Sequence, residues 1–272
     1  MSSSSYQPDG EVLPPHGDPP GAYIAEEIPA PRRRTRSILS APGTYVLVGI
    51  NCAVYLWMVL HGVDPATPTP AQLIHFGANV PVLVLHGQWY RLLSAIFVHV
   101  GLIHLLTNMW CLWNLGLLGE PLLGPWGMGA VYLLTGVAGN LLSLLVNLLM
   151  HDVVSVGAGA SGAVFGIAGI LIVLLSNRKL PIPAFELNRL RRSVIQFAGL
   201  NLVIGLATIV LPLIRIDNSA HVGGFLSGLA LGVPLVPRMT SGRTRYLARQ
   251  KLTFAIAALL LALFGHWIAN LR

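Results

Sequence analysis

Four polar residues lie inside stretches that are otherwise strongly apolar, and their side chains are those of a hydrolase. They are His104, Asn108, Ser161 and His221. A serine hydroxyl is a weak nucleophile until a base removes its proton, and a neutral imidazole can take that proton and later protonate the leaving amine. A second histidine and an asparagine add side-chain donors that can stabilise an oxyanion. These residue types predict peptide-bond hydrolysis by a serine nucleophile.

The spacing of these residues predicts how helices would bring them together. His104 and Asn108 are four residues apart, so they share one helix face. Residues 157–162 consist of glycine, alanine and one serine, Ser161, and leave backbone amides free at a helix N-terminus, where the helix dipole favours negative charge. His221 begins a stripe of small residues that allows close helix packing in a membrane. The stripe continues through Gly224, Gly228 and Gly232.

Seven apolar stretches would have to position these side chains. Each has roughly 17 to 23 residues, the length at which a helix spans a hydrocarbon core. They cover approximately residues 44–60, 99–118, 127–149, 158–175, 193–214, 220–236 and 252–271. Because 54% of the residues are hydrophobic and only 10% are charged, a water-soluble enzyme is not expected. The sequence predicts an all-α, polytopic membrane protein.

The basic residues predict the orientation of this protein in the membrane. With the N-terminus in the cytoplasm, 14 of the 17 basic residues lie on the cytoplasmic side, as membrane proteins prefer. The net charge of +7 is thereby explained without a nucleic-acid partner. This orientation places all four polar residues in the outer half of the membrane: His104, Asn108, Ser161 and His221. Their helices run from the outer side of the membrane to the cytoplasmic side.

The chain divides into three predicted parts. Residues 1–37 contain no apolar run and are expected to form a disordered cytoplasmic tail, which is not a signal peptide. Residues 38–237 hold the first six apolar stretches, and residues 238–272 hold a basic linker and the seventh. The connection over residues 61–98 mixes aromatic and polar side chains, and is either a membrane-interface segment or an ordinary folded loop.

Other chemistries have weaker support in the sequence. The His-Glu-x-x-His pattern of zinc proteases is absent, and no metal or other cofactor is expected. Glu120 is expected in the loop between the second and third stretches, so no carboxylate would lie inside a helix, and a Ser-His dyad is simpler than a triad. Each polar residue taken alone also fits helix packing. A transporter would require ionisable groups throughout the depth of the bilayer, and here they are near one side.

Four segments of the sequence resemble the rhomboid family of intramembrane serine proteases. Residues 159–166 are similar to the family's Gly-x-Ser-Gly nucleophile motif, and residues 104–108 are similar to its His-x-x-x-Asn pair. Residues 220–224 resemble its histidine motif in helix 6. Trp89-Tyr90-Arg91 resembles its Trp-x-Arg element. The resemblance implies a six-helix core, here followed by one C-terminal transmembrane helix.

The resemblance also implies a role for each motif residue. Ser161 would be the nucleophile and His221 the base, while His104, Asn108 and the Ser161 amide would form the oxyanion hole. Gly159 would help to shape the loop before the nucleophile. Many bacterial members have a tyrosine four residues after the serine, stacked on the histidine. Phe165 stands there in this chain, and because it keeps the ring we expect activity to be retained.

The resemblance implies cleavage of other proteins' transmembrane segments near the outer face of the membrane. The expected partners are single-span or polytopic membrane protein substrates and the lipid bilayer, with no nucleic acid, metal or other cofactor. The expected location is the bacterial plasma membrane, with the N-terminus in the cytoplasm. The alternative is a non-catalytic rhomboid-like protein that binds client transmembrane helices.

Overall fold

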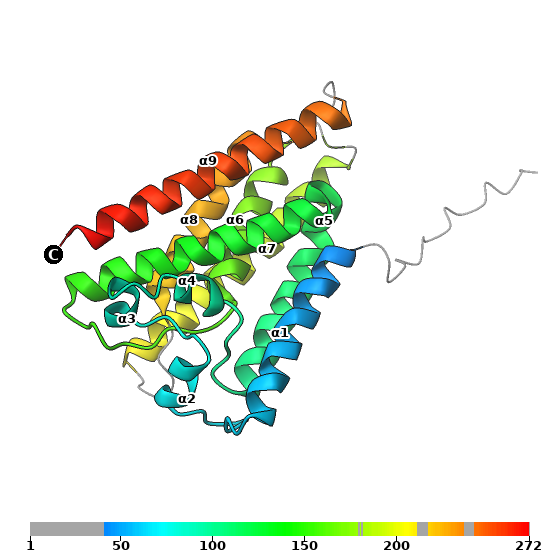
Figure 1. Cartoon of the computed structure of the whole chain (residues 1–272). Coiled ribbons are helices and arrows are strands. Elements are labelled where there is room, and N and C mark those ends of the chain that lie inside the picture. Colours follow the sequence, from blue (N-terminus) through cyan, green and yellow to red (C-terminus); the bar gives the residue numbers. More distant parts are fainter. Residues whose placement is uncertain (1–40, 179, 181, 211–216, 237–241, 272) are drawn as a thin grey trace, which may run out of the picture. The chain divides into compact units, whose positions relative to one another are not determined.

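The computed structural model describes residues 41–178, 180, 182–210, 217–236 and 242–271 (Figure 1). The predicted tail, residues 1–37, and residues 238–241 of the basic linker lie outside the described residues. Within the described ranges the regular structure is helical, which confirms the all-α prediction. The helices are α1 (Pro42–Leu60), α2 (Pro70–His75), α3 (Pro81–Leu85), α4 (Arg91–Ser94), α5 (Leu102–Leu149), α6 (Ser161–Leu174), α7 (Ala184–Val210), α8 (Asn218–Leu235) and α9 (Arg243–Ala269).

α5 consists of two helices that meet at Gly124. This residue has φ 75° and ψ 164°, a conformation that glycine adopts without a steric penalty. Pro125 follows it and has no backbone N–H to continue the helical ladder. The first arm (residues 102–123) and the second arm (residues 125–149) correspond to the predicted stretches 99–118 and 127–149. Figure 1 shows the first arm beside α1 and the second arm beside α9.

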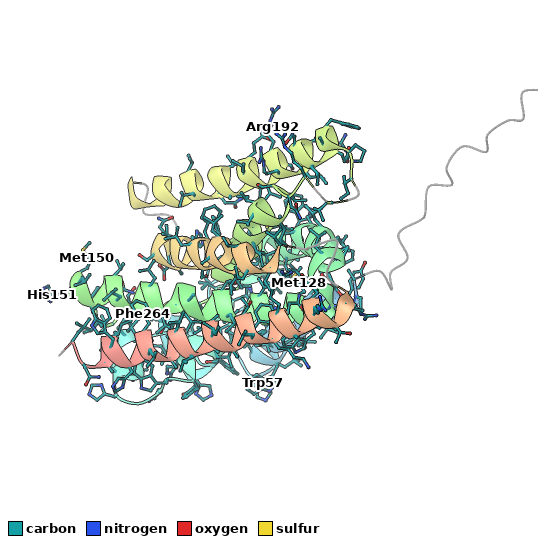
Figure 2. All side chains as sticks on the ribbon, turned by 90° about the horizontal axis from the view of Figure 1, so that it is seen from above. Trp57, Met128, Met150, His151, Arg192 and Phe264 are labelled. Atoms are coloured by element: carbon teal, nitrogen blue, oxygen red, sulfur yellow. The ribbon has the colours of Figure 1, made fainter. Side chains whose placement is uncertain are left out.

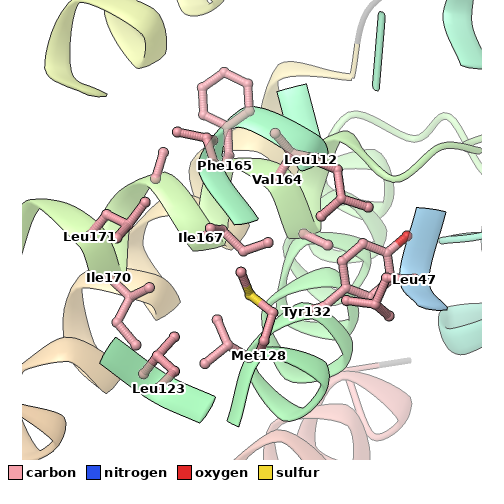
Figure 3. Close-up of a cluster of buried hydrophobic side chains, with 14 of the residues drawn as sticks. Leu47, Leu112, Leu123, Met128, Tyr132, Val164, Phe165, Ile167, Ile170 and Leu171 are labelled. Carbon is pink, nitrogen blue, oxygen red and sulfur yellow. The ribbon is translucent and has the colours of Figure 1, made fainter. Parts of the chain in front are cut away.

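α6 lies in the interior of the helical core. Ten consecutive residues from Gly162 are buried, through Leu171, as expected for a helix that is apolar on every side. Figure 3 shows Ile167 and Ile170 of α6 close to Met128 of α5. With 14 residues, α6 is shorter than the predicted stretch 158–175, because residues 158–160 belong to the loop before it.

α1, α5 and α9 are long and apolar enough to cross a membrane. In the most apolar windows of α1 and α9 only 28% and 17% of the residues are buried inside the protein. Trp57 of α1 and Met150 after α5 project outwards from the helices (Figure 2). Apolar side chains exposed on long apolar helices are the expected contact surface for lipid.

Glu120 anchors the start of α1, and its predicted loop position is wrong. It belongs to the first arm of α5, is buried, and accepts hydrogen bonds from the Gly43 and Thr44 backbone amides at 2.8 and 2.7 Å. The Thr44 hydroxyl donates a third bond at 2.7 Å. A carboxylate is stabilised there because the first amides of a helix have no intrahelical partners. The expectation that no carboxylate lies inside a helix is therefore also wrong.

The connection over residues 61–98 is folded around the side chain of Arg91. The buried guanidinium donates to the carbonyls of Ile74 and Ala78 at 2.8 and 3.0 Å, and to the Gln88 side chain at 2.7 Å. These bonds join α4 to α2 and to the segments on either side of α3. A position of this connection at the membrane interface, one of the two alternatives, stays a prediction.

Candidate active site

Ser161 is the first residue of α6, and the loop before it is held by the connection between α1 and α5. Asn79 and Gly157 exchange two backbone hydrogen bonds of 2.8 Å, and the Gly159 amide donates to the Ala95 carbonyl at 2.9 Å. No side chain caps the N-terminus of α6. The first amides of α6 therefore remain available at the positive end of the helix dipole, beside a half-buried serine hydroxyl.

His221 lies in the first turns of α8, and Asp217 fixes the start of that helix. One carboxylate oxygen of Asp217 accepts from the Ala220 amide at 2.9 Å, and the other accepts from the Ser143 hydroxyl of α5. Asp217 is thus the N-terminal cap of α8. The His221 side chain is buried, and its Nδ1 has no hydrogen-bond partner within the described residues.

The small-residue stripe of α8 packs directly on α6. A Cβ atom at Gly224 would lie 1.9 Å from the carbonyl oxygen of Gly162, and one at Gly228 would lie 2.0 Å from that of Gly166. No side chain fits between the two backbones at these crossings. The stripe therefore brings the helix of His221 against the helix of Ser161, as its spacing predicts.

Phe165 joins the two helices at the level of His221. Its ring stacks on the imidazole with 4.3 Å between ring centroids and an angle of 15° between planes. Phe165 follows Ser161 by four residues and so occupies the same face of α6. His221 therefore lies over the face of α6 that carries Ser161. Among the described residues, no hydrogen bond joins the Ser161 and His221 side chains. Hydrogen bonds between catalytic side chains often become short only when substrate is bound.

His104 reaches the same loop from the first arm of α5. The Val100 amide donates to its Nδ1 at 3.3 Å, so a neutral ring carries its proton on Nε2. That Nε2 lies 3.1 Å from the position that a Cβ atom would take at Gly159, where φ is +132°. Only a glycine fits there without strain and without colliding with the imidazole. The His104 donor therefore points at the loop two residues before Ser161.

Asn108 lies one turn after His104 and is buried. Its amide donates one hydrogen bond to the His104 carbonyl at 2.9 Å, which leaves a second N–H. His99 is the residue that the sequence reasoning missed near this position. It is fully buried, its Nε2 has no partner in the described part of the chain, and its ring centroid is 5.5 Å from that of His104. In the sequence, the one sign that His99 could lie near the site is its position at the start of the apolar stretch 99–118.

The arrangement brings together a serine, two imidazoles, an amide side chain and an uncapped helix N-terminus. Among the described residues no group of three or more His, Cys, Asp or Glu side chains could hold a metal ion. Glu120 is engaged with α1 and Asp217 with the cap of α8. The groups present are those of nucleophilic acyl transfer with a neutral histidine base.

Comparisons with known proteins find relatives of this chain. A family model described as "Rhomboid domain" matches residues 86–238. The chain is 33% identical over 196 residues to "Rhomboid protease GluP" of Bacillus subtilis (strain 168), covering 70% of this chain and 35% of that protein. It is 35% identical over 178 residues to "RHOMBOID-like protein 5" of Arabidopsis thaliana, covering 65% of this chain and 53% of that protein.

A third relative is matched over most of its length. The chain is 30% identical over 207 residues to "Rhomboid protease AarA" of Providencia stuartii, covering 71% of this chain and 72% of that protein. By contrast, the chain spans about a third of the Bacillus protein and about half of the Arabidopsis protein.

Proposed function

Because this integral membrane protein belongs to the rhomboid family, we propose that it is an intramembrane serine protease that cleaves transmembrane segments of other membrane proteins. The observation that carries the proposal is the Phe165–His221 stack, because it brings a histidine to the face of α6 that begins with Ser161. The substrates are single-span or polytopic membrane proteins in the lipid bilayer.

In the proposed reaction, Ser161 attacks the carbonyl carbon of the scissile amide while His221 takes the hydroxyl proton. The tetrahedral oxyanion accepts hydrogen bonds from the Ser161 amide, the His104 Nε2–H and the free N–H of Asn108. The carbon–nitrogen bond then breaks, and His221 returns its proton to the leaving amine. Water, activated by the same histidine, hydrolyses the acyl-enzyme and regenerates the serine.

A dyad is preferred over a triad because of the surroundings of His221. In a triad a carboxylate accepts a hydrogen bond from Nδ1 of the base and orients its ring. Nδ1 of His221 is buried without a partner among the described residues. The stacked ring of Phe165 and the backbone contact between α6 and α8 take over the orienting role.

The substrate helix is proposed to reach the site through a groove between α1, the first arm of α5 and α7. This groove has a volume of about 860 Å³ and includes Thr107, which adjoins Asn108. A helical substrate must unwind near the site, because its own hydrogen bonds shield the carbonyl that Ser161 attacks. Cleavage is proposed near the outer face, with the N-terminus in the cytoplasm.

The test is cleavage of a tagged single-span substrate co-expressed with the wild type or with Ser161→Ala. We expect cleavage by the wild type and none by the variant. Ser176→Ala is the matched control, since Ser176 lies exposed after the C-terminal end of α6 and its hydroxyl bonds the Ile172 carbonyl. Equal cleavage by wild type and Ser161→Ala would refute serine catalysis. Capture of the substrate without cleavage by the wild type would favour the client-binding alternative.

A second measurement addresses the base. A fluorophosphonate probe should label Ser161 of the wild type, and His221→Ala should abolish the labelling. Labelling at wild-type rate in His221→Ala would contradict the role of His221 as base.

A further inference from the structure

The groove between α1, the first arm of α5 and α7 contains uncharged polar side chains in an otherwise mainly apolar lining. They are Thr107 and Asn114 of α5 and Asn201 of α7. The two asparagines come from different helices and line the same groove. Polar side chains at membrane depth are rare and mark functional surfaces.

Each asparagine is only partly satisfied by its own helix. The Asn114 amide donates to the Trp110 carbonyl at 2.7 Å, and the Asn201 amide donates to the Phe197 carbonyl at 2.9 Å. In the described part of the chain, the Oδ1 atom and second N–H of each have no partner. In hydrocarbon an unpaired amide is costly. The groove therefore offers hydrogen-bond acceptors and donors from two of the helices that line it.

We propose that this groove selects client transmembrane helices that carry a hydroxyl or amide side chain facing Asn114 or Asn201. Serine, threonine, asparagine and glutamine both donate and accept, so each can pair with the free atoms of an asparagine. A lipid chain offers neither group, and a charged side chain costs more to bring to that depth. The identity of the occupant as a substrate helix rests on the proposed protease function.

The sequence separation sets where the polar residue of the client helix should lie. Asn114 follows His104 by ten residues in the first arm of α5, a distance of about 15 Å along the helix. A client helix running beside this arm, with its scissile bond near His104, would present its polar side chain about ten residues from that bond. A polar residue about five residues from the scissile bond would face an apolar part of the groove instead.

The test uses a single-span substrate with an all-leucine segment after the cleavage site. One leucine is replaced by asparagine at successive positions between about four and sixteen residues from the scissile bond. For the wild type we expect cleavage to rise by roughly three- to tenfold at positions near ten, which is the usual range for an interhelical hydrogen bond in a membrane. An equal cleavage rate at every position would overturn the proposal.

The double variant Asn114→Leu with Asn201→Leu identifies the residues responsible. It should lose the preference for asparagine near position ten, so that the variant cleaves the asparagine substrates and the all-leucine substrate at equal rates. Asn270→Leu is the matched control, because Asn270 makes the same bond to a carbonyl four residues earlier but lies after α9, away from the groove. A preference that survives in the double variant would overturn the proposal.

A capture experiment measures the same preference without cleavage. In the Ser161→Ala background, the tagged substrate with asparagine near position ten should co-purify roughly three- to tenfold more than the all-leucine substrate. The double variant should remove this difference. Equal capture of both substrates would refute selection by the groove. Selective capture by a wild type that cleaves nothing would instead refute the protease proposal alone.

Discussion

The Phe165 ring stacks on the His221 imidazole, and we propose that this stack orients the imidazole for catalysis. A stacked aromatic pair contributes about 0.5–1.5 kcal/mol beyond the burial of its area, and in the proposed dyad the stack takes the place of a carboxylate partner. Phe165→Ala should therefore slow cleavage by roughly two- to tenfold. Phe165→Tyr should stay near the wild-type rate, because it keeps the ring. The measurement is the initial rate on a fluorescent transmembrane substrate in detergent or vesicles.

The control for Phe165→Ala removes a similar stack in α9, a helix that carries none of the proposed site residues. Phe264 and Trp267 of α9 stack with 5.8 Å between ring centroids and 15° between planes. Phe264→Ala should leave the cleavage rate within error of the wild type. If it slows cleavage as much as Phe165→Ala does, loss of general stability explains both results and the orienting role is wrong.

At the scale of single elements, the start of α8 fixes the position of His221, the proposed base. Asp217→Ala removes a helix cap, which costs about 0.5–2 kcal/mol. The buried Ser143 hydroxyl donates to the same carboxylate, so the substitution also removes its hydrogen-bond acceptor. We expect a lower Tm and a lower cleavage rate, because the first turn that carries His221 is no longer tied to α5. Asp217→Asn should keep most of the thermal stability and most of the cleavage rate, since the amide carbonyl oxygen still accepts a hydrogen bond.

The control is the same substitution in a carboxylate that caps only a loop. Asp64 accepts from the Ala66 and Thr67 amides at 2.8 and 2.7 Å and lies exposed between α1 and α2. Asp64→Ala should change Tm less and should leave cleavage unchanged. Thermal unfolding in detergent and the fluorescent cleavage assay measure both effects. A normal cleavage rate in Asp217→Ala would contradict the positioning role of the cap.

The sequence predicts long helices and motif residues, because both leave local signals. The arms of α5 coincide with two apolar stretches, and the spacing of Gly224 and Gly228 predicts the contact with α6. Elements that depend on distant partners are not visible in this way. α2, α3 and α4 have only four to six residues each and are held by Arg91. The same holds for Glu120, because its partner Thr44 is 76 residues away.

At the scale of the whole molecule, α9 supplies hydrogen-bond donors to the carbonyls that the break in α5 leaves unpaired. The break at Gly124 leaves carbonyls at the end of the first arm without their intrahelical donors. The Tyr246 hydroxyl donates to the Leu122 carbonyl at 3.1 Å, and Gln250 Nε2 donates to the Leu123 carbonyl at 2.8 Å. Gly127 leaves room for this glutamine, because a Cβ atom there would lie 2.8 Å from Nε2. α9, which corresponds to the seventh predicted apolar stretch, is therefore joined to the helical core by hydrogen bonds.

Gln250→Leu tests this dependence, because leucine keeps the bulk of the side chain and removes its donor. The Leu123 carbonyl would then be buried without a partner, which costs about 1–3 kcal/mol. We expect a clear fall in Tm by thermal unfolding in detergent, with a cleavage rate near normal well below Tm, since the hydrogen bonds of Gln250 go to Leu123 and Tyr246 and not to a site residue. Lys251→Leu, at the exposed neighbouring position, should leave Tm nearly unchanged. An unchanged Tm in Gln250→Leu would mean that the break in α5 is stable by itself and that α9 only packs beside it.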